Sequence, residues 1–136
     1  MKYRKFQGSL VTWQQLFREA AEFATTLGPA AVHSISHSAS ASRGIVVVWY
    51  REGVVGPEPA EIDLAMKFFY KRGTFVSWEE LFNASCDHAA QLQPEQVVSF
   101  SHSDTKGDGI AALWYWDAAD GPSQPEPPAD SAQEPG

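Results

Sequence analysis

The stretch that decides the fold is Val11-Thr12-Trp13-Gln14-Gln15-Leu16-Phe17, which recurs 65 residues later as Val76-Ser77-Trp78-Glu79-Glu80-Leu81-Phe82. With this shift, residues 1–52 align with residues 66–117 without a gap, and 19 of the 52 columns are identical. Random pairing would give roughly 3 identities, and similarity at a fixed spacing is the first feature to interpret in a sequence. We therefore predict a tandem duplication of one small unit.

The duplication divides the chain into four parts. Repeat one covers residues 1–52, a linker rich in Gly and Pro covers 53–65, and repeat two covers 66–117. The tail, residues 118–136, is acidic, and five of its last 17 residues are proline. A segment with so few apolar side chains cannot offset the entropy of ordering, so we predict that the tail is disordered.

Each repeat is predicted to contain one helix. Thr12 and Ser77 are N-cap residues, and Gln15 and Glu80 follow each of them at the spacing of a capping box. Apolar side chains then recur at helical spacing. A dipeptide that ends in proline stops each helix, Gly28-Pro29 in the first repeat and Gln93-Pro94 in the second.

Three strands are predicted around each helix. Residues 2–7 and 67–72 precede the helices, residues 32–38 and 97–103 follow them, and residues 45–51 and 110–116 come after a turn rich in Ser, Asp and Gly. The last strand is apolar on both faces, which is typical of a central strand covered on both sides. The fold class is therefore α+β, with two β-α-β-β repeats and an antiparallel strand order of 1-3-2 in each.

One helix cannot cover both faces of a sheet, so the repeats are expected to cover each other. We predict a pseudo-twofold intrachain dimer, in which the two sheets either pack face to face or join into one curved six-stranded sheet. A single repeat of 52 residues would be only marginally stable.

Charge and composition exclude several classes of function. The net charge is −7, with +3 on residues 1–53 and −3 on residues 66–119, so the repeats should attract each other. An acidic chain is a poor nucleic-acid binder, and no apolar run is long enough to span a membrane. A single cysteine, Cys86, is typical of a reducing compartment, so we expect a cytoplasmic protein.

His37 and His102 are the histidines that both repeats share. They could act together on a ligand or metal near the pseudo-twofold axis, or each could close the edge of the core, and we favour the second interpretation. Consecutive strand residues alternate between faces, so Ser101-His102-Ser103-Asp104 cannot form a hydrolase triad. We expect no catalytic residues and no metal site.

Four further aromatic residues are candidates for a ligand-binding site. Trp49 and Tyr50 recur as Trp114 and Tyr115 on the predicted central strands, and Trp13 and Trp78 open the helices. Such side chains could stack on a flat ligand, form an oligomer interface, or simply fill the core. Together with His37 and His102, these four residues are the candidate site.

The strand–helix–strand–strand order and the helix start Ser77-Trp78-Glu79-Glu80 resemble the dodecins, which are small oligomeric flavin-binding proteins. Dodecins stack flavin on a tryptophan of the second strand, and residues 32–38 and 97–103 contain none. We therefore expect no cofactor and carry over no functional residue.

The sequence thus predicts a non-catalytic module that interacts with a protein partner or with itself as a homo-oligomer. A small-ligand binder with a site between the repeats is the alternative, and an enzyme that uses the two histidines is the third.

Overall fold

The computed structural model describes residues 1–8, 11–40, 43–53, 63–105 and 108–119. Most of the predicted linker and almost all of the predicted tail lie outside these residues. The described chain forms two units with the same element order. The first unit contains β1 (Lys2–Gly8), α1 (Trp13–Leu27), β2 (Val32–Ser40) and β3 (Arg43–Tyr50). The second contains β4 (Leu64–Thr74), α2 (Trp78–Ala89), a 3-10 turn η1 (Pro94–Gln96), β5 (Val97–Thr105) and β6 (Asp108–Ala118).

Both helices begin where the sequence predicts. The hydroxyl of Thr12 accepts a hydrogen bond of 3.1 Å from the N–H of Gln15, and the hydroxyl of Ser77 accepts one of 3.1 Å from Glu80. The first helix ends at Leu27 and is capped by Gly28, whose φ of 87° favours glycine. The second ends earlier than predicted, at Ala89, and the residues from Pro94 form the 3-10 turn instead.

Each unit has a three-stranded antiparallel sheet. The strand order is β1-β3-β2 in the first sheet and β4-β6-β5 in the second, which confirms the predicted order. The pairing registers also agree after a shift of 65, since Tyr3 pairs with Trp49 as Phe68 pairs with Trp114. A register irregularity near the start of β2, after Val32, recurs in β5. This agreement is compatible with the predicted duplication.

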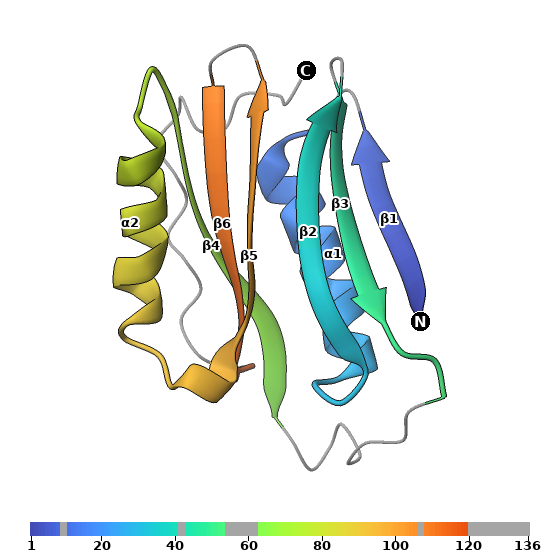
Figure 1. Cartoon of the computed structure of the whole chain (residues 1–136). Coiled ribbons are helices and arrows are strands. Elements are labelled where there is room, and N and C mark those ends of the chain that lie inside the picture. The colour runs from blue at the N-terminus through green and yellow to red at the C-terminus, as the bar shows by residue number, and fades with distance from the viewer. Residues whose placement is uncertain (9–10, 41–42, 54–62, 106–107, 120–136) are drawn as a thin grey trace.

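The two sheets remain separate, and α1 lies between them (Figure 1). This helix packs on β3 and β1 of its own unit and on β4 of the other unit, whereas α2 packs on β6 and β4 of its own unit. The layers therefore run in the order α2, second sheet, α1, first sheet. Neither predicted alternative fully describes this arrangement: β2 lies beside β5 where the sheets meet, but the sheets do not pair into one, and α1 packs between β1 and β3 of the first sheet and β4 of the second.

The predicted pseudo-twofold packing is wrong. A twofold axis would place α2 on the first sheet in the same way that α1 lies on the second, and the main contacts of α2 stay within its own unit. Ile35 is 1% exposed at the junction between the units, but its counterpart Phe100 is 54% exposed. The units are stacked head to tail, so equivalent residues lie in different surroundings.

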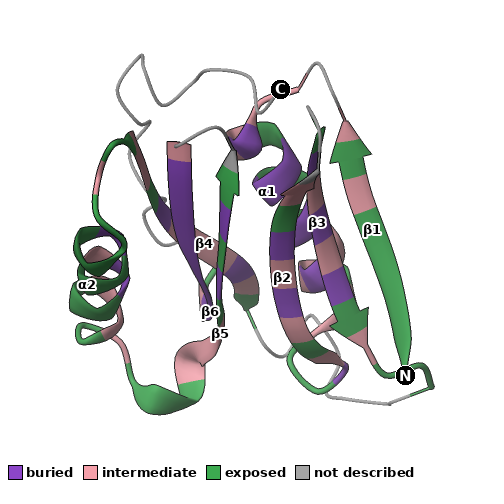
Figure 2. Ribbon diagram, turned by 45° about the horizontal axis from the view of Figure 1, so that its top comes forward, coloured by how far each residue is buried: buried purple, intermediate pink, exposed green. Residues whose placement is uncertain are grey.

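The core lies on both sides of α1 (Figure 2). The ring of Phe17 lies within 5.2–5.6 Å of the rings of Tyr70, Trp114 and Phe68, all from the second sheet. Buried side chains follow almost the whole length of β6, whereas β1 is exposed along most of its length. The predicted burial of the last strand on both faces thus holds for β6 alone.

Candidate functional site

A closed polar cluster lies where the two units meet. The hydroxyl of Ser101 accepts a hydrogen bond of 3.0 Å from the indole N–H of Trp114 and lies 2.5 Å from Nδ1 of His37. The imidazole of His37 also makes edge-on contacts with the rings of Trp13 and Phe17, at centroid distances of 5.4 and 5.2 Å. The cluster ties β2 to β5 across the inter-unit junction.

His37 is buried and neutral at physiological pH. The pKa of His37 is lowered from 6.5 to about 3, chiefly by burial and to a smaller extent by the nearby His102, while the backbone of Ile110 opposes the shift only in part. Its Nε2 makes no hydrogen bond to any described residue. A buried base with this pKa is suited to joining two units rather than to transferring protons.

Three hydrogen bonds between side-chain hydroxyls and backbone groups extend the same junction. The hydroxyl of Ser99 accepts a bond of 3.1 Å from the N–H of Ile35 and donates one of 2.8 Å to the carbonyl of the same residue. The hydroxyl of Thr25 accepts a bond of 2.9 Å from the N–H of Met66. These bonds satisfy backbone groups at the edge of β2 and at the start of β4.

Exposed side chains gather on the second unit at the α2–β5 surface, which we define as Trp78, Phe82, Cys86, Phe100 and His102. The rings of Trp78 and Phe82 are stacked at 5.4 Å, and the imidazole of His102 lies edge-on to both, also at 5.4 Å. Exposed aromatic groups of this kind mark binding sites rather than ordinary surface.

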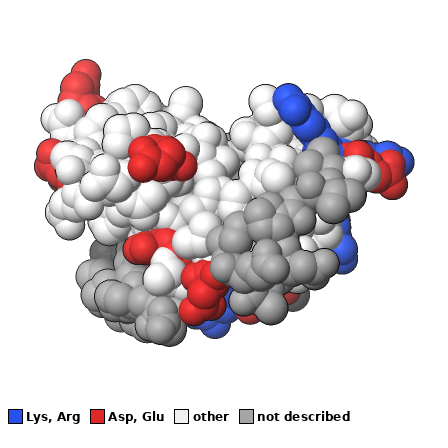
Figure 3. Space-filling model, turned by 90° about the horizontal axis from the view of Figure 1, so that it is seen from below, with Lys and Arg blue, Asp and Glu red and all other residues white. Residues whose placement is uncertain are grey.

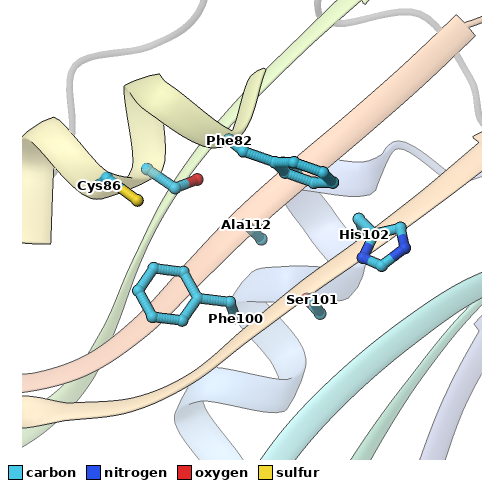
Figure 4. A pocket seen from close by; sticks show the side chains of 8 residues that line it. Phe82, Cys86, Phe100, Ser101, His102 and Ala112 are labelled. Atoms are coloured by element: carbon cyan, nitrogen blue, oxygen red, sulfur yellow. The ribbon is translucent and has the colours of Figure 1, made fainter. Parts of the chain in front are cut away.

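A pocket of about 230 Å³ opens within this surface (Figure 4). Phe82 and Cys86 line it from the helix, and Phe100 and His102 line it from β5. Its floor includes Ala111, and the first unit has the larger Val46 at the equivalent place. The smaller side chain leaves space under α2 that is filled under α1.

The outer face of the first sheet is a second exposed surface. We call the set Tyr3, Lys5, Ser36, Val47 and Trp49 the first-sheet face. The indole N–H of Trp49 donates a hydrogen bond of 3.1 Å to the hydroxyl of Ser36. The rings of Tyr3 and Trp49 lie 5.6 Å apart, and these side chains are 61% and 37% exposed. No helix of the described chain covers this face.

The six predicted site residues do not meet at one place. His37 and Trp114 lie at the junction between the units, His102 lies on the α2–β5 surface, and Trp49 lies on the first-sheet face. The tyrosines lie on the helix-facing sides of the sheets.

Tyr50 lies 5.5 Å from the ring of Phe23. The hydroxyl of Tyr115 lies 3.4 Å from the imidazole of His88, which also stacks on Phe69. Burial raises the pKa of Tyr115, as does the neighbouring Asp117, and burial lowers the pKa of His88. Both tyrosines act as packing residues.

Sequence reasoning missed Phe82, Phe100 and Tyr3, which dominate the exposed surfaces. A signal was present in the helices. Ala20 and Ala21 of α1 become Ser85 and Cys86 in α2, and polar replacements on an apolar stripe indicate that less of that helix is covered.

Among the described residues, no group of three or more His, Cys, Asp or Glu side chains is placed to hold a metal ion. No helix of the described chain is both long and apolar enough to span a bilayer. Comparison with family models, with curated proteins and with solved structures finds no match for this chain. Its function must be argued from its own surfaces.

Proposed function

We propose that this protein is a non-catalytic self-assembly module, which binds copies of itself through exposed aromatic surfaces. One observation carries the proposal. Two aromatic side chains of α1 are buried in the first unit, and their counterparts on α2 are exposed in the second unit. Phe17 is 0% exposed and Phe82 is 40% exposed, while Trp13 is 2% exposed and Trp78 is 37% exposed.

The comparison depends on a common origin of the units, which we infer from their sequence and structure together. The sequences agree in 19 of 52 columns, and the strand registers agree at the same shift of 65. When equivalent surfaces are buried in one unit and exposed in the other, the exposed one is a candidate interface. We place this module in the cytoplasm, where the thiol of Cys86 stays reduced.

Sedimentation velocity over a range of about 1 to 300 µM tests the proposal, because weak protein interfaces have dissociation constants in this range. We expect the average mass to rise with concentration above 14.9 kDa, the mass of one chain. A protein that stays monomeric over the whole range would overturn the proposal.

A second candidate function is the binding of a small apolar ligand in the α2–β5 pocket. The hydroxyl of Ser85 lines this pocket and is buried without a hydrogen-bond partner among the described residues, as a ligand contact would require. Native mass spectrometry of the purified protein should then show an added mass. The variant Ala111→Val, which installs the residue of the first unit, should lose it, and an unmodified wild-type mass argues against this candidate.

A further inference from the structure

The junction between the two units has two complementary halves. One half is the outer surface of α1 with the edge of β2, where Phe17, Ile35 and His37 are buried. The other half is the face of the second sheet that carries Trp114 and Ser101. The two halves come from different parts of the unit, so the contact is heterologous.

Each half occurs once more in the molecule, and in the part of the chain that the structure describes no other element covers either second occurrence. The α2–β5 surface repeats the first half, with Phe82, Phe100 and His102 at the places of Phe17, Ile35 and His37. The first-sheet face repeats the second half, with Trp49 and Ser36 at the places of Trp114 and Ser101. The hydrogen bond within this half is the same in both places, since the indole of Trp49 donates to Ser36 as the indole of Trp114 donates to Ser101.

We propose that the first-sheet face of one molecule docks on the α2–β5 surface of a second copy of this chain, and so repeats the intrachain junction between molecules. The inference rests on the proposed self-assembly and specifies its geometry. Trp49 of one copy covers Phe82 of the other, and the hydroxyl of Ser36 meets the imidazole of His102. The layer order α2, sheet, α1, sheet then continues into the next molecule.

Charge favours the same pairing. Glu79 is exposed on the first turn of α2 beside Trp78, whereas Lys5 of the first-sheet face stands where the junction has Tyr70. Residues 66–119 carry a net −3 and residues 1–53 a net +3. In the view from below, acidic side chains gather on the half formed by the second unit and most basic ones lie on the other half (Figure 3). Complementary charge of this kind orients partners and speeds their encounter.

One contact of the junction has no intermolecular counterpart. Thr25 accepts a hydrogen bond from the backbone of Met66, and α2 ends before Ala90, the residue at the equivalent place. The intermolecular contact also lacks the covalent linker that holds the two units at high local concentration. The association is therefore weaker than the intrachain junction and reversible.

Because the contact is heterologous, one surface remains free at each end of any open assembly. Successive molecules form a ring if the rotation per step closes, and an open chain if it does not. A twofold dimer does not arise from this contact.

Two single-surface variants of the full chain test the geometry. Trp49→Glu disables the first-sheet face and leaves the α2–β5 surface intact, and Phe82→Glu does the reverse. Each variant alone is expected to sediment as a monomer, with self-association weakened about 30-fold or more. An equimolar mixture should form a 1:1 heterodimer and nothing larger, because one intact surface of each kind remains. Ala30→Glu, in the exposed turn after α1, adds the same charge outside both surfaces and should assemble like the wild type.

The outcomes separate the geometry from the proposed function. A wild-type protein that never associates overturns the proposed function and this inference with it. If Trp49→Glu alone still dimerises, the contact is α2 against α2. If Phe82→Glu alone still dimerises, the contact is sheet face against sheet face, and either result overturns the head-to-tail geometry while self-assembly stands. Tyr3→Glu and Phe100→Glu, at side chains 61% and 54% exposed, replace either variant that fails to show the wild-type circular dichroism spectrum.

Discussion

Ser101 and Ser36 occupy the same place in the two units, and their surroundings predict different costs of removal. Ser101 is 7% exposed and satisfies both the indole of Trp114 and the imidazole of His37. Ser101→Ala should lower the free energy of unfolding by about 2 to 4 kcal/mol, because it leaves two buried groups without a partner. Ser36→Ala should cost about 0.5 kcal/mol or less, since the half-exposed indole of Trp49 can turn to water.

Urea unfolding at a concentration where the protein is monomeric measures both costs. Equal losses in the two variants would show that the polar cluster at the junction contributes no more than an exposed hydrogen bond.

His37 predicts how stability depends on pH. Its pKa is about 3 in the folded protein and 6.5 in the unfolded chain, so only the unfolded chain binds a proton between these values. Stability that is complete above pH 6.5 is therefore lost as the pH falls toward 3. The loss should approach about 1.4 kcal/mol per pH unit, or about 2 kcal/mol between roughly pH 7 and pH 5.

His37→Asn isolates this contribution, because asparagine keeps a polar group near the position of Nδ1 and does not titrate. The variant should be less stable than the wild type near neutral pH, by roughly 2 kcal/mol, and the difference should shrink as the pH falls. His33→Asn, on the same strand but exposed, is the control and should keep the wild-type slope. A constant difference between His37→Asn and the wild type would mean that His37 binds a proton equally well in the folded protein and in the unfolded chain.

At the level of elements, sequence pattern was sufficient for the local structure and the sheet order. The caps at Thr12 and Ser77, the strands and the 1-3-2 order all follow from spacing and residue type. The position of α1 between two sheets did not follow, because both helices share Trp, Leu and Phe at the same places. What separates them is how wide the apolar arc is, and this becomes decisive only once the packing partner is known.

The two helices should differ in local stability. Residues of α1 are covered by both sheets, so its amides should exchange with solvent only on global unfolding, whereas α2 can open alone from the outside of the stack. Ser77→Ala removes a cap worth about 1 kcal/mol and should speed exchange in α2 about fivefold, with α1 unchanged. Thr12→Ala removes the same kind of cap and should lower protection throughout the molecule.

Hydrogen exchange followed by mass spectrometry on the monomeric protein distinguishes the two variants. If the amides of both helices were equally protected from exchange in the wild type, the position of a helix in the layers would not determine its local stability.

At the level of the whole molecule, the repeat directs attention to the wrong residues for a binding site. Comparing the repeats selects side chains that are identical in both, such as His37 and His102 or Trp49 and Trp114, and suggests that they act as symmetric pairs. In a head-to-tail stack, identical residues have unlike surroundings, so each pair is divided between a junction and a surface. Comparing residue identities cannot reveal this difference, because the difference arises from how the two units are stacked and not from the sequence of either unit.

The stacking predicts one final contrast, between Phe17 and Phe82. Phe17→Ala removes the ring that joins α1 to Phe68, Tyr70 and Trp114, and should lower the free energy of unfolding by about 3 to 5 kcal/mol. Because α1 belongs to the core of both units, the whole described chain should still unfold in one transition. Phe82→Ala should cost about 1 kcal/mol in the monomer, since its ring is 40% exposed, and act mainly on self-association.

Far-ultraviolet circular dichroism and tryptophan fluorescence, recorded together during urea unfolding, measure this contrast. Coincident curves in the wild type and in Phe17→Ala would place both units in one cooperative structure, because the tryptophans are distributed over both. Separate curves for Phe17→Ala would instead show that the second unit folds without α1. In that event the face that carries Trp114 would be stable while uncovered, and the equally uncovered face that carries Trp49 would no longer indicate a missing partner.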